Sequence, residues 1–187
     1  RTMPKTKDLY IDIGAASKAA AEDKVSLGDY GVFDSAVVEF GDGLIKAKAI
    51  DDRVGCAALL KLIEDEPPID TWFCFTVQEE VGLRGAASMA YALDPGFAMV
   101  LEGTTAADLA EVEGGKAVCR VRGGVVLPFM DGATIYDAEL FELMRNACDK
   151  RGIRWQTKTR VAGGTDAGRI HKSRAGVRVC AAAAPVR

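Results

Sequence analysis

The 187-residue sequence predicts a three-layer α/β fold built on a mixed, mostly parallel sheet. Two observations predict it. From about residue 48 onward, short apolar runs alternate with stretches of helical periodicity, which is the order expected when crossover helices join parallel strands. One of these runs, 71–77 (TWFCFTV), is apolar almost throughout, as in a strand that is buried on both faces.

The elements follow in a regular order. In the first part we expect strands at 8–14, 37–40 and 44–50, and a short helix at 17–24. In the second part we expect helices at 51–65, about 83–92, 136–152 and from 165, and strands at 71–77, 97–102, 117–121, 153–159 and 177–184. The helix at 51–65 ends before two prolines, and the helix at 136–152 is closed by Gly152.

Composition and charge exclude several classes of function. The net charge is −3 and the basic residues are scattered, which argues against binding nucleic acid or an anionic membrane. No apolar run approaches the roughly 20 residues that span a bilayer, and the first residues lack the apolar core of a signal peptide. The five dispersed cysteines form no CxxC pair, so we expect core thiols in a reducing cytoplasm.

Carboxylates follow three separate apolar runs. Asp51 and Asp52 come after 44–50, Glu79 and Glu80 after 71–77, and Glu102 closes the next run. Residues at strand ends can converge on one crevice of an α/β sheet. Several buried carboxylates need cations between them, and two metal ions that share a carboxylate can activate a water molecule. Within the Glu79–Glu80 doublet, one side chain can bind a metal while the other acts as general base.

Each acidic segment also has a simpler interpretation. A Glu-Glu doublet is usually a solvated loop, an Asp-Asp doublet often caps a helix, and Glu102 could simply close a strand. The GGTDAG segment could be a loop near the substrate, or a glycine turn with a helix cap. Five further residues are candidates to contact substrate or to orient a ligand: Asp52, Thr104, Gly164, Thr165 and Asp166.

At these residues the sequence resembles a known family. The segments AIDDRVGCAALLKLIE, FTVQEEVGLRGA, FAMVLEGTTAADL, MDGATIYDAELFELM and GGTDAGRIHKSRAGV are similar to those of the dinuclear-metal aminopeptidases, which include glutamyl, deblocking and tetrahedral aminopeptidases. The resemblance implies a peptide-cleaving catalytic domain that uses two zinc or cobalt ions and is interrupted by a PDZ-like β domain used in assembly. Residues 1–47 would be the C-terminal part of that insert, and 48–187 the catalytic domain.

The resemblance also assigns roles. Asp51 matches the carboxylate that bridges both metals, and Asp52 its neighbour, between which the family often has a cis peptide bond. Glu79 matches the general base. Glu80 and Glu102 match ligands of one metal each. The resemblance further implies a homo-oligomer in the full-length protein.

The family completes its metal site with two histidines, and this chain contains neither position. The only histidine, His171, does not match a ligand. The chain therefore resembles a fragment that lacks both histidine ligands, and we expect it to hold metal weakly and to show little or no peptidase activity, because catalytic zinc normally has three protein ligands.

Two other functions stay open from the sequence. A glycoside hydrolase of the endoglucanase type would use two carboxylates as acid and base, but few aromatic residues are placed to form a sugar-stacking cleft. A non-catalytic chain with a role in assembly is the other alternative. Sensitivity to a chelator distinguishes the peptidase from the glycosidase.

Overall fold

In the computed structural model, residues 3–112 and 116–187 are described. The main sheet has four strands in the order β3-β6-β4-β5, which are Phe97–Thr105, Arg178–Val186, Val125–Val126 and Trp155–Gln156. β3 pairs with β6 and β4 with β5 in parallel, whereas β4 pairs with β6 in antiparallel orientation. The predicted mixed, mostly parallel sheet is therefore confirmed.

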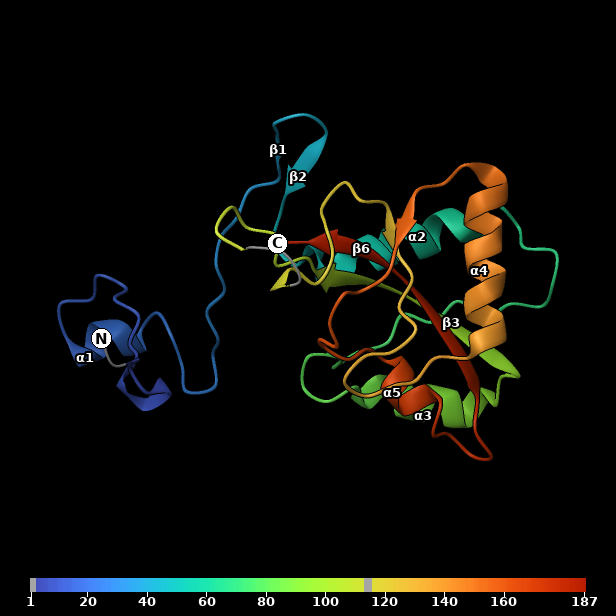
Figure 1. The fold of residues 1–187 in the computed structure, drawn as a ribbon. Coiled ribbons are helices and arrows are strands. Elements are labelled where there is room, and N and C mark those ends of the chain that lie inside the picture. The colour runs from blue at the N-terminus through green and yellow to red at the C-terminus, as the bar shows by residue number, and fades with distance from the viewer. Residues whose placement is uncertain (1–2, 113–115) are drawn as a thin grey trace.

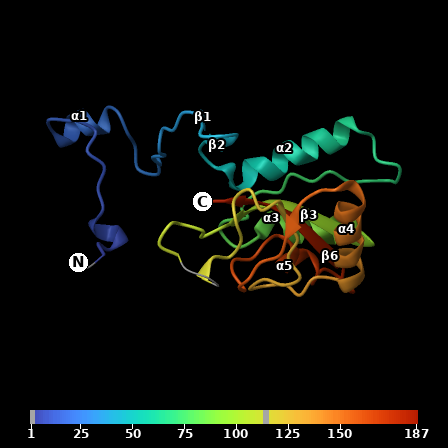
Figure 2. The ribbon, with the colours of Figure 1, turned by 45° about the horizontal axis from the view of Figure 1, so that its top comes forward.

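Helices cover both faces of this sheet (Figures 1 and 2). α2 (Ile50–Glu64) lies over one face, against the backbone of β3. α3 (Arg84–Leu93) and α5 (Ala167–Ile170) cover the other face. The core between them and the sheet consists of Tyr136 and of small and branched apolar side chains: Ala86, Ala90, Val100, Ala167, Ile170, Val177, Val179 and Ala181. This three-layer arrangement is the predicted fold class.

α4 (Ala138–Arg151) packs beside β6 and has defined signals at both ends. The side chain of Asp137 accepts a hydrogen bond from a backbone N–H of the first turn, and Gly152 ends the helix at φ +64°. Arg178, the first residue of β6, donates to Asp137 and to Glu139 at 2.7 and 2.6 Å. These contacts join the start of α4 to the start of β6.

Two predicted strands of the catalytic part are absent. Residues 71–77 are extended but form no strand, and 117–121 form none either. In the second case Ala117, Val118 and Cys119 are buried, and the amides of Val118 and Cys119 both donate to the carbonyl of Ala106. Residues 117–121 are therefore mostly apolar because three of them are buried, although they do not pair as a strand of the sheet. The strand predicted at 153–159 shortens to β5.

The first part of the chain carries little regular structure. It contains η1 (Thr6–Asp8), α1 (Lys18–Glu22) and the antiparallel hairpin of β1 (Val38–Phe40) with β2 (Leu44–Lys46). The strand predicted at 8–14 is absent, and this region stands away from the α/β body in Figure 1. Its assignment to a PDZ-like domain stays a prediction. Across the described ranges, no helix has the length and apolar character needed to cross a membrane.

Candidate active site

A cavity of about 880 Å³ lies between the extended segment 71–76 and β3. Six of the nine predicted site residues line it: Asp51, Asp52, Glu79, Glu80, Glu102 and Asp166. They come from the start of α2, the turn after segment 71–77, the carboxyl half of β3 and the residue before α5. The structure thus brings acids that are far apart in the sequence to one cavity.

Close packing of α2 on β3 positions the two aspartates. Gly55 of α2 lies so near β3 that a Cβ atom built on it would approach the carbonyl oxygen of Leu101 to 2.4 Å. A Cβ atom on Gly103 would lie 3.0 Å from the Cβ of Asp51. The Asp52 carboxylate accepts a hydrogen bond of 3.0 Å from the amide of Gly55. The Asp51–Asp52 peptide bond is cis, in agreement with the resemblance.

The Glu79–Glu80 doublet sits in a turn and does not follow a paired strand. Gln78 has a left-handed backbone conformation, with φ +61°. The carbonyl of Glu79 then accepts hydrogen bonds from the amides of Gly82 and Leu83, at 3.0 and 2.9 Å, and the chain enters α3. Local turn geometry, with no strand ladder, therefore sets the position of both carboxylates.

Burial, and then the charges of neighbouring acids, raise three carboxyl pKa values in this cavity. Burial, followed by the charges of Glu79, Asp51 and Asp52, raises the pKa of Glu102 to about 9, although the nearby Lys158 ammonium acts in the opposite direction. Burial and the charge of Glu80 raise the pKa of Glu79 to about 7. Burial is also the main reason why the pKa of Asp52 rises to about 6. This end of the cavity favours a cation.

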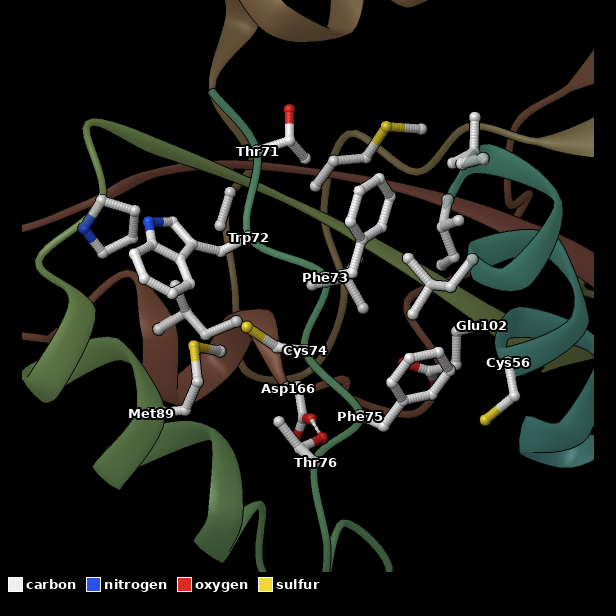
Figure 3. A pocket seen from close by; sticks show the side chains of 18 of the residues that line it. Cys56, Thr71, Trp72, Phe73, Cys74, Phe75, Thr76, Met89, Glu102 and Asp166 are labelled. Carbon is white, nitrogen blue, oxygen red and sulfur yellow. Dashed lines mark hydrogen bonds between the residues drawn. The ribbon is translucent and has the colours of Figure 1, made fainter. Parts of the chain in front are cut away.

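Asp166 joins the GGTDAG segment to segment 71–77. Its Oδ2 atom accepts a hydrogen bond from the hydroxyl of Thr76 (Figure 3). Its Oδ1 atom is buried and has no hydrogen-bond partner among the described residues. A buried carboxylate oxygen without a partner is costly in a folded protein. A donor or a cation bound in the cavity would supply what this atom lacks.

A buried hydrogen-bond network supports the GGTDAG segment. The hydroxyl of Tyr136 donates to Asp131 at 2.6 Å and lies 3.1 Å from the hydroxyl oxygen of Thr165. Asp131 also accepts hydrogen bonds of 2.8 Å from the amides of Ala133 and Thr134. No role of Asp131 or Tyr136 is predictable from the sequence, since nothing local shows that they meet Thr165.

Three predicted site residues do not line the cavity. Thr104 is buried in β3, Thr165 belongs to the network around Tyr136, and Gly164 packs near Ala133. Lys158 was missed, because its polar neighbours Thr157 and Thr159 give no local sign of burial. It is buried, and its ammonium donates to the carbonyl of Ala162 at 3.0 Å.

The acids fit a divalent cation in charge and donor type but not in number. Carboxylate oxygens suit such ions, and burial together with neighbouring carboxylates raises the pKa values of Glu102 and Glu79, which a nearby cation would lower. However, within residues 3–112 and 116–187 no group of three His, Cys, Asp or Glu side chains lies close enough to hold a metal. Catalytic zinc takes three protein ligands. His171 lies outside this cavity, and its Nδ1 atom is 2.7 Å from the carbonyl oxygen of Ala167.

Comparison with known proteins decides the family. The model of the M42 glutamyl aminopeptidases matches residues 1–187. The chain belongs to this family. It is 36% identical to a predicted aminopeptidase from Acetivibrio thermocellus over 96% of the chain and 54% of that protein. It is 31% identical to the glutamyl aminopeptidase of Lactococcus lactis, over 94% of the chain and 50% of the relative. The chain spans about half the length of these relatives.

Solved structures of peptidases share the fold. An aminopeptidase from the archaeon Desulfurococcus kamchatkensis superposes with a TM-score of 0.92 at 33% identity, over 99% of this chain and 53% of that one. The TET1 peptidase of Pyrococcus horikoshii gives a TM-score of 0.74 at 28% identity, over 93% of this chain and 51% of that one. That peptidase can assemble into a tetrahedron or a large octahedral shell. The resemblance to tetrahedral aminopeptidases is confirmed.

Proposed function

We propose that the protein is a metal-dependent aminopeptidase that removes N-terminal residues from peptides. The observation that carries this proposal is the M42 match along the whole of residues 1–187, which includes every acidic segment at the cavity. The concentration of carboxylates with raised pKa values in that cavity supports the same function.

The carboxylates would divide into ligands and a base. Asp51, Glu80 and Glu102 would hold two divalent ions, zinc or cobalt, with Asp51 shared between them. Bound ions would supply Lewis acidity toward the scissile carbonyl. Since fewer than three donors converge among the described residues, further ligands must come from elsewhere in the active protein. Asp52 and the buried Asp166 would orient the ligands or contact the substrate.

Glu79 is the proposed general base. Its carboxylate lines the cavity next to the proposed ligand Glu80, and burial and the charge of Glu80 raise its pKa to about 7 in the metal-free cavity. It would take a proton from a water molecule whose oxygen attacks the carbonyl carbon of the first peptide bond. As the carbon–nitrogen bond breaks, Glu79 would give this proton to the leaving amine. The acidic end of the cavity would attract the free α-ammonium group of the peptide.

Metal titration and peptide hydrolysis test this function. Zinc binding by calorimetry and hydrolysis of aminoacyl-p-nitroanilides are to be measured on residues 1–187 and on a full-length M42 protein that contains them. We expect weak binding and little turnover for the former, and two zinc ions with chelator-sensitive turnover for the latter. In the full-length protein, Glu79→Gln should lower kcat by at least ~100-fold, whereas Glu39→Gln, on exposed β1, should not. Chelator-resistant cellulose hydrolysis would favour the glycoside hydrolase.

Assembly and location are further parts of the proposal. The assemblies formed by the TET1 peptidase support a homo-oligomer for the full-length protein. The five free cysteine thiols support our proposal that the protein is located in the reducing environment of the cytoplasm.

A further inference from the structure

The turn that carries Glu79, the proposed general base, is wound tightly onto the start of α3. The carbonyl of Glu79 accepts hydrogen bonds from the amides of Gly82 and Leu83. The amide of Gly85 donates to the carbonyl of Val77 at 3.0 Å, and a Cβ atom on Gly85 would approach that carbonyl oxygen to 2.5 Å. Only glycine allows so close an approach, and the downstream side of Glu79 is therefore fixed to the helix.

The upstream side, residues 71–76, has one anchor. Within the described residues, the hydrogen bond from Thr76 to Asp166 is the only one that joins this segment to a distant part of the chain. Figure 3 shows the two side chains turned toward each other. Asp166 is only 9% exposed, so water has little access to replace Thr76 as its donor. The position of Thr76 therefore depends on Asp166.

Asp166 is itself firmly held. It precedes α5, and its carbonyl accepts hydrogen bonds from the amides of Arg169 and Ile170 at 3.0 and 3.1 Å. The buried side chains of Ala167 and Ile170 pack in one core with those of α3. The backbone that carries Asp166 is thus part of the packed interior, and it can serve as a fixed point for the exposed segment before Glu79.

These contacts close a ring around Glu79. A Cβ atom built on Gly168 of α5 would lie 3.3 Å from the Cδ1 atom of Leu83, and the amide of Leu83 donates to the carbonyl of Glu79 at 2.9 Å. The start of α5 therefore touches the turn through Leu83 and the segment before it through Asp166. Because Glu79 follows Thr76 closely in the sequence, a shift of Thr76 is passed on to the Glu79 carboxylate.

We propose that Thr76 and Asp166 are positioning residues for the general base. Their hydrogen bond holds the Glu79 carboxylate where it takes a proton from the attacking water molecule. This inference rests on the proposed function, and it assigns a task to two side chains that carry no reacting atom. A displacement of about 1 Å in a catalytic group can lower a rate about 100-fold. Loss of the bond lowers kcat, while KM changes little, since substrate binding does not need the base.

The hydrogen bond is separable from the charge of Asp166. Asp166→Asn keeps an oxygen atom that can accept from Thr76, but it lacks the negative charge that a cation at the unpartnered Oδ1 atom would need. If Asp166 acted by its charge, on a metal ion or on the substrate ammonium, Asp166→Asn would be as harmful as Asp166→Ala. A positioning role requires only the acceptor.

Steady-state kinetics of a full-length M42 protein that contains residues 1–187 test the proposal. The substrate is an aminoacyl-p-nitroanilide, and each variant is assayed well below its Tm. We expect Thr76→Val and Asp166→Ala each to lower kcat by about 10–100-fold, with KM changed less than about twofold. The double variant should be no slower than the slower single variant, because both substitutions break the same bond.

Conservative variants and a matched control make the kinetic test specific. Thr76→Ser and Asp166→Asn preserve the hydrogen bond and should retain roughly a third or more of kcat. Thr71→Val removes a hydroxyl of the same segment that bonds only to the nearby carbonyl of Ile69. It should leave kcat within about twofold of the unsubstituted value.

Hydrogen exchange on residues 1–187 tests the same ring without metal or substrate. In Thr76→Val, the amides of Gly82 and Leu83, which bond to the carbonyl of Glu79, should exchange about tenfold faster relative to the amides of α4. Thr76→Ser should leave this ratio unchanged. Circular dichroism checks that each variant folds. An equal ratio in Thr76→Val and Thr76→Ser would overturn the proposal.

Three kinetic results would also overturn it while the proposed function stands. These are equal kcat values for Thr76→Val and Thr71→Val, an additive double variant, and an Asp166→Asn variant that loses more than roughly tenfold in kcat. The last result decides even if Asp166→Ala does not fold. Absence of chelator-sensitive turnover in the unsubstituted full-length protein would instead overturn the proposed function, and this inference with it.

Discussion

The hydroxyl of Thr76 donates a hydrogen bond to the carboxylate of Asp166, a residue 90 positions further along the chain. This contact connects the extended segment before the Glu79–Glu80 turn with the residue before α5. Because the second oxygen of Asp166 has no partner among the described residues, the bond from Thr76 is the only one that the structure gives to this carboxylate.

Thr76→Val is expected to destabilise the chain by about 1–3 kcal/mol, because it leaves a buried carboxylate without a donor. Chemical denaturation measures the difference. Thr71→Val is the control, since its exposed hydroxyl bonds only to the nearby carbonyl of Ile69; it should change stability by less than ~0.5 kcal/mol. Equal effects of the two substitutions would show that the Thr76–Asp166 bond does not stabilise the fold.

Gly55→Ala is expected to separate α2 from β3, because the added methyl group would collide with the Leu101 carbonyl and the Asp52 carboxylate. Overpacking of this kind costs about 1–3 kcal/mol. Gly96→Ala is the matched control, as a Cβ atom there meets no atom within 4 Å. Thermal unfolding of both variants measures the effect, and a Tm for Gly55→Ala equal to that of the unsubstituted chain would contradict the close approach.

Tyr136→Phe is expected to loosen the loop that carries Asp166. The substitution removes the hydroxyl that bonds to Asp131 and Thr165, at a cost of about 1–2 kcal/mol. Faster hydrogen exchange at 163–168 should accompany the loss of stability. Tyr91→Phe, at a tyrosine that is 63% exposed, should alter neither quantity. Unchanged exchange at 163–168 would mean that the loop is held by other contacts.

Metal-free chain is expected to lose stability as the pH rises from about 5 to about 9. The pKa of Glu102 is about 9 in the folded chain against an ordinary value of 4.5. Between these values the folded state retains a proton that the unfolded state has lost, so the free energy of unfolding falls as pH increases. Glu79, with a pKa of about 7, adds to the fall in the lower part of this range.

Urea unfolding in the presence of a chelator, at several pH values, checks this dependence. Glu102→Gln should flatten the curve, because the amide has no proton to lose, while Glu39→Gln on exposed β1 should leave it unchanged. A free energy of unfolding that rises between these pH values would contradict the arrangement of acids.

The sequence predicts best those elements whose signals are local. α4 is predicted by its amphipathic pattern, which ends at Gly152, and the structure adds that Asp137 caps its start. That Asp51, Glu79 and Glu102 line one cavity was also predictable, since each comes at or after the end of an apolar segment. Their convergence on a metal stays a prediction.

Partners in space were harder to predict. The apolar pattern of 71–77 predicts a strand that is buried on both faces, and this prediction is wrong for the described structure, in which the segment forms no strand and none of its residues is buried. An apolar pattern does not show whether a neighbouring strand is present to pair with it. The contact of Tyr136 with Asp131 depends on a reversal of the chain between them, and its contact with Thr165 joins residues 29 positions apart. The periodicity of a local sequence segment predicts neither contact.

The parallel pairing of β3 with β6 has a kinetic consequence. It aligns Phe97 with Arg178 and continues in register to Thr105 and Val186, so each contact joins residues distant in the sequence. Closing so long a loop costs chain entropy before the hydrogen bonds between the two strands can form and offset that cost. Folding therefore slows as the contact order increases. This half of the fold should assemble late, on a timescale of milliseconds or longer, after the local turns of α2 and α4 have formed.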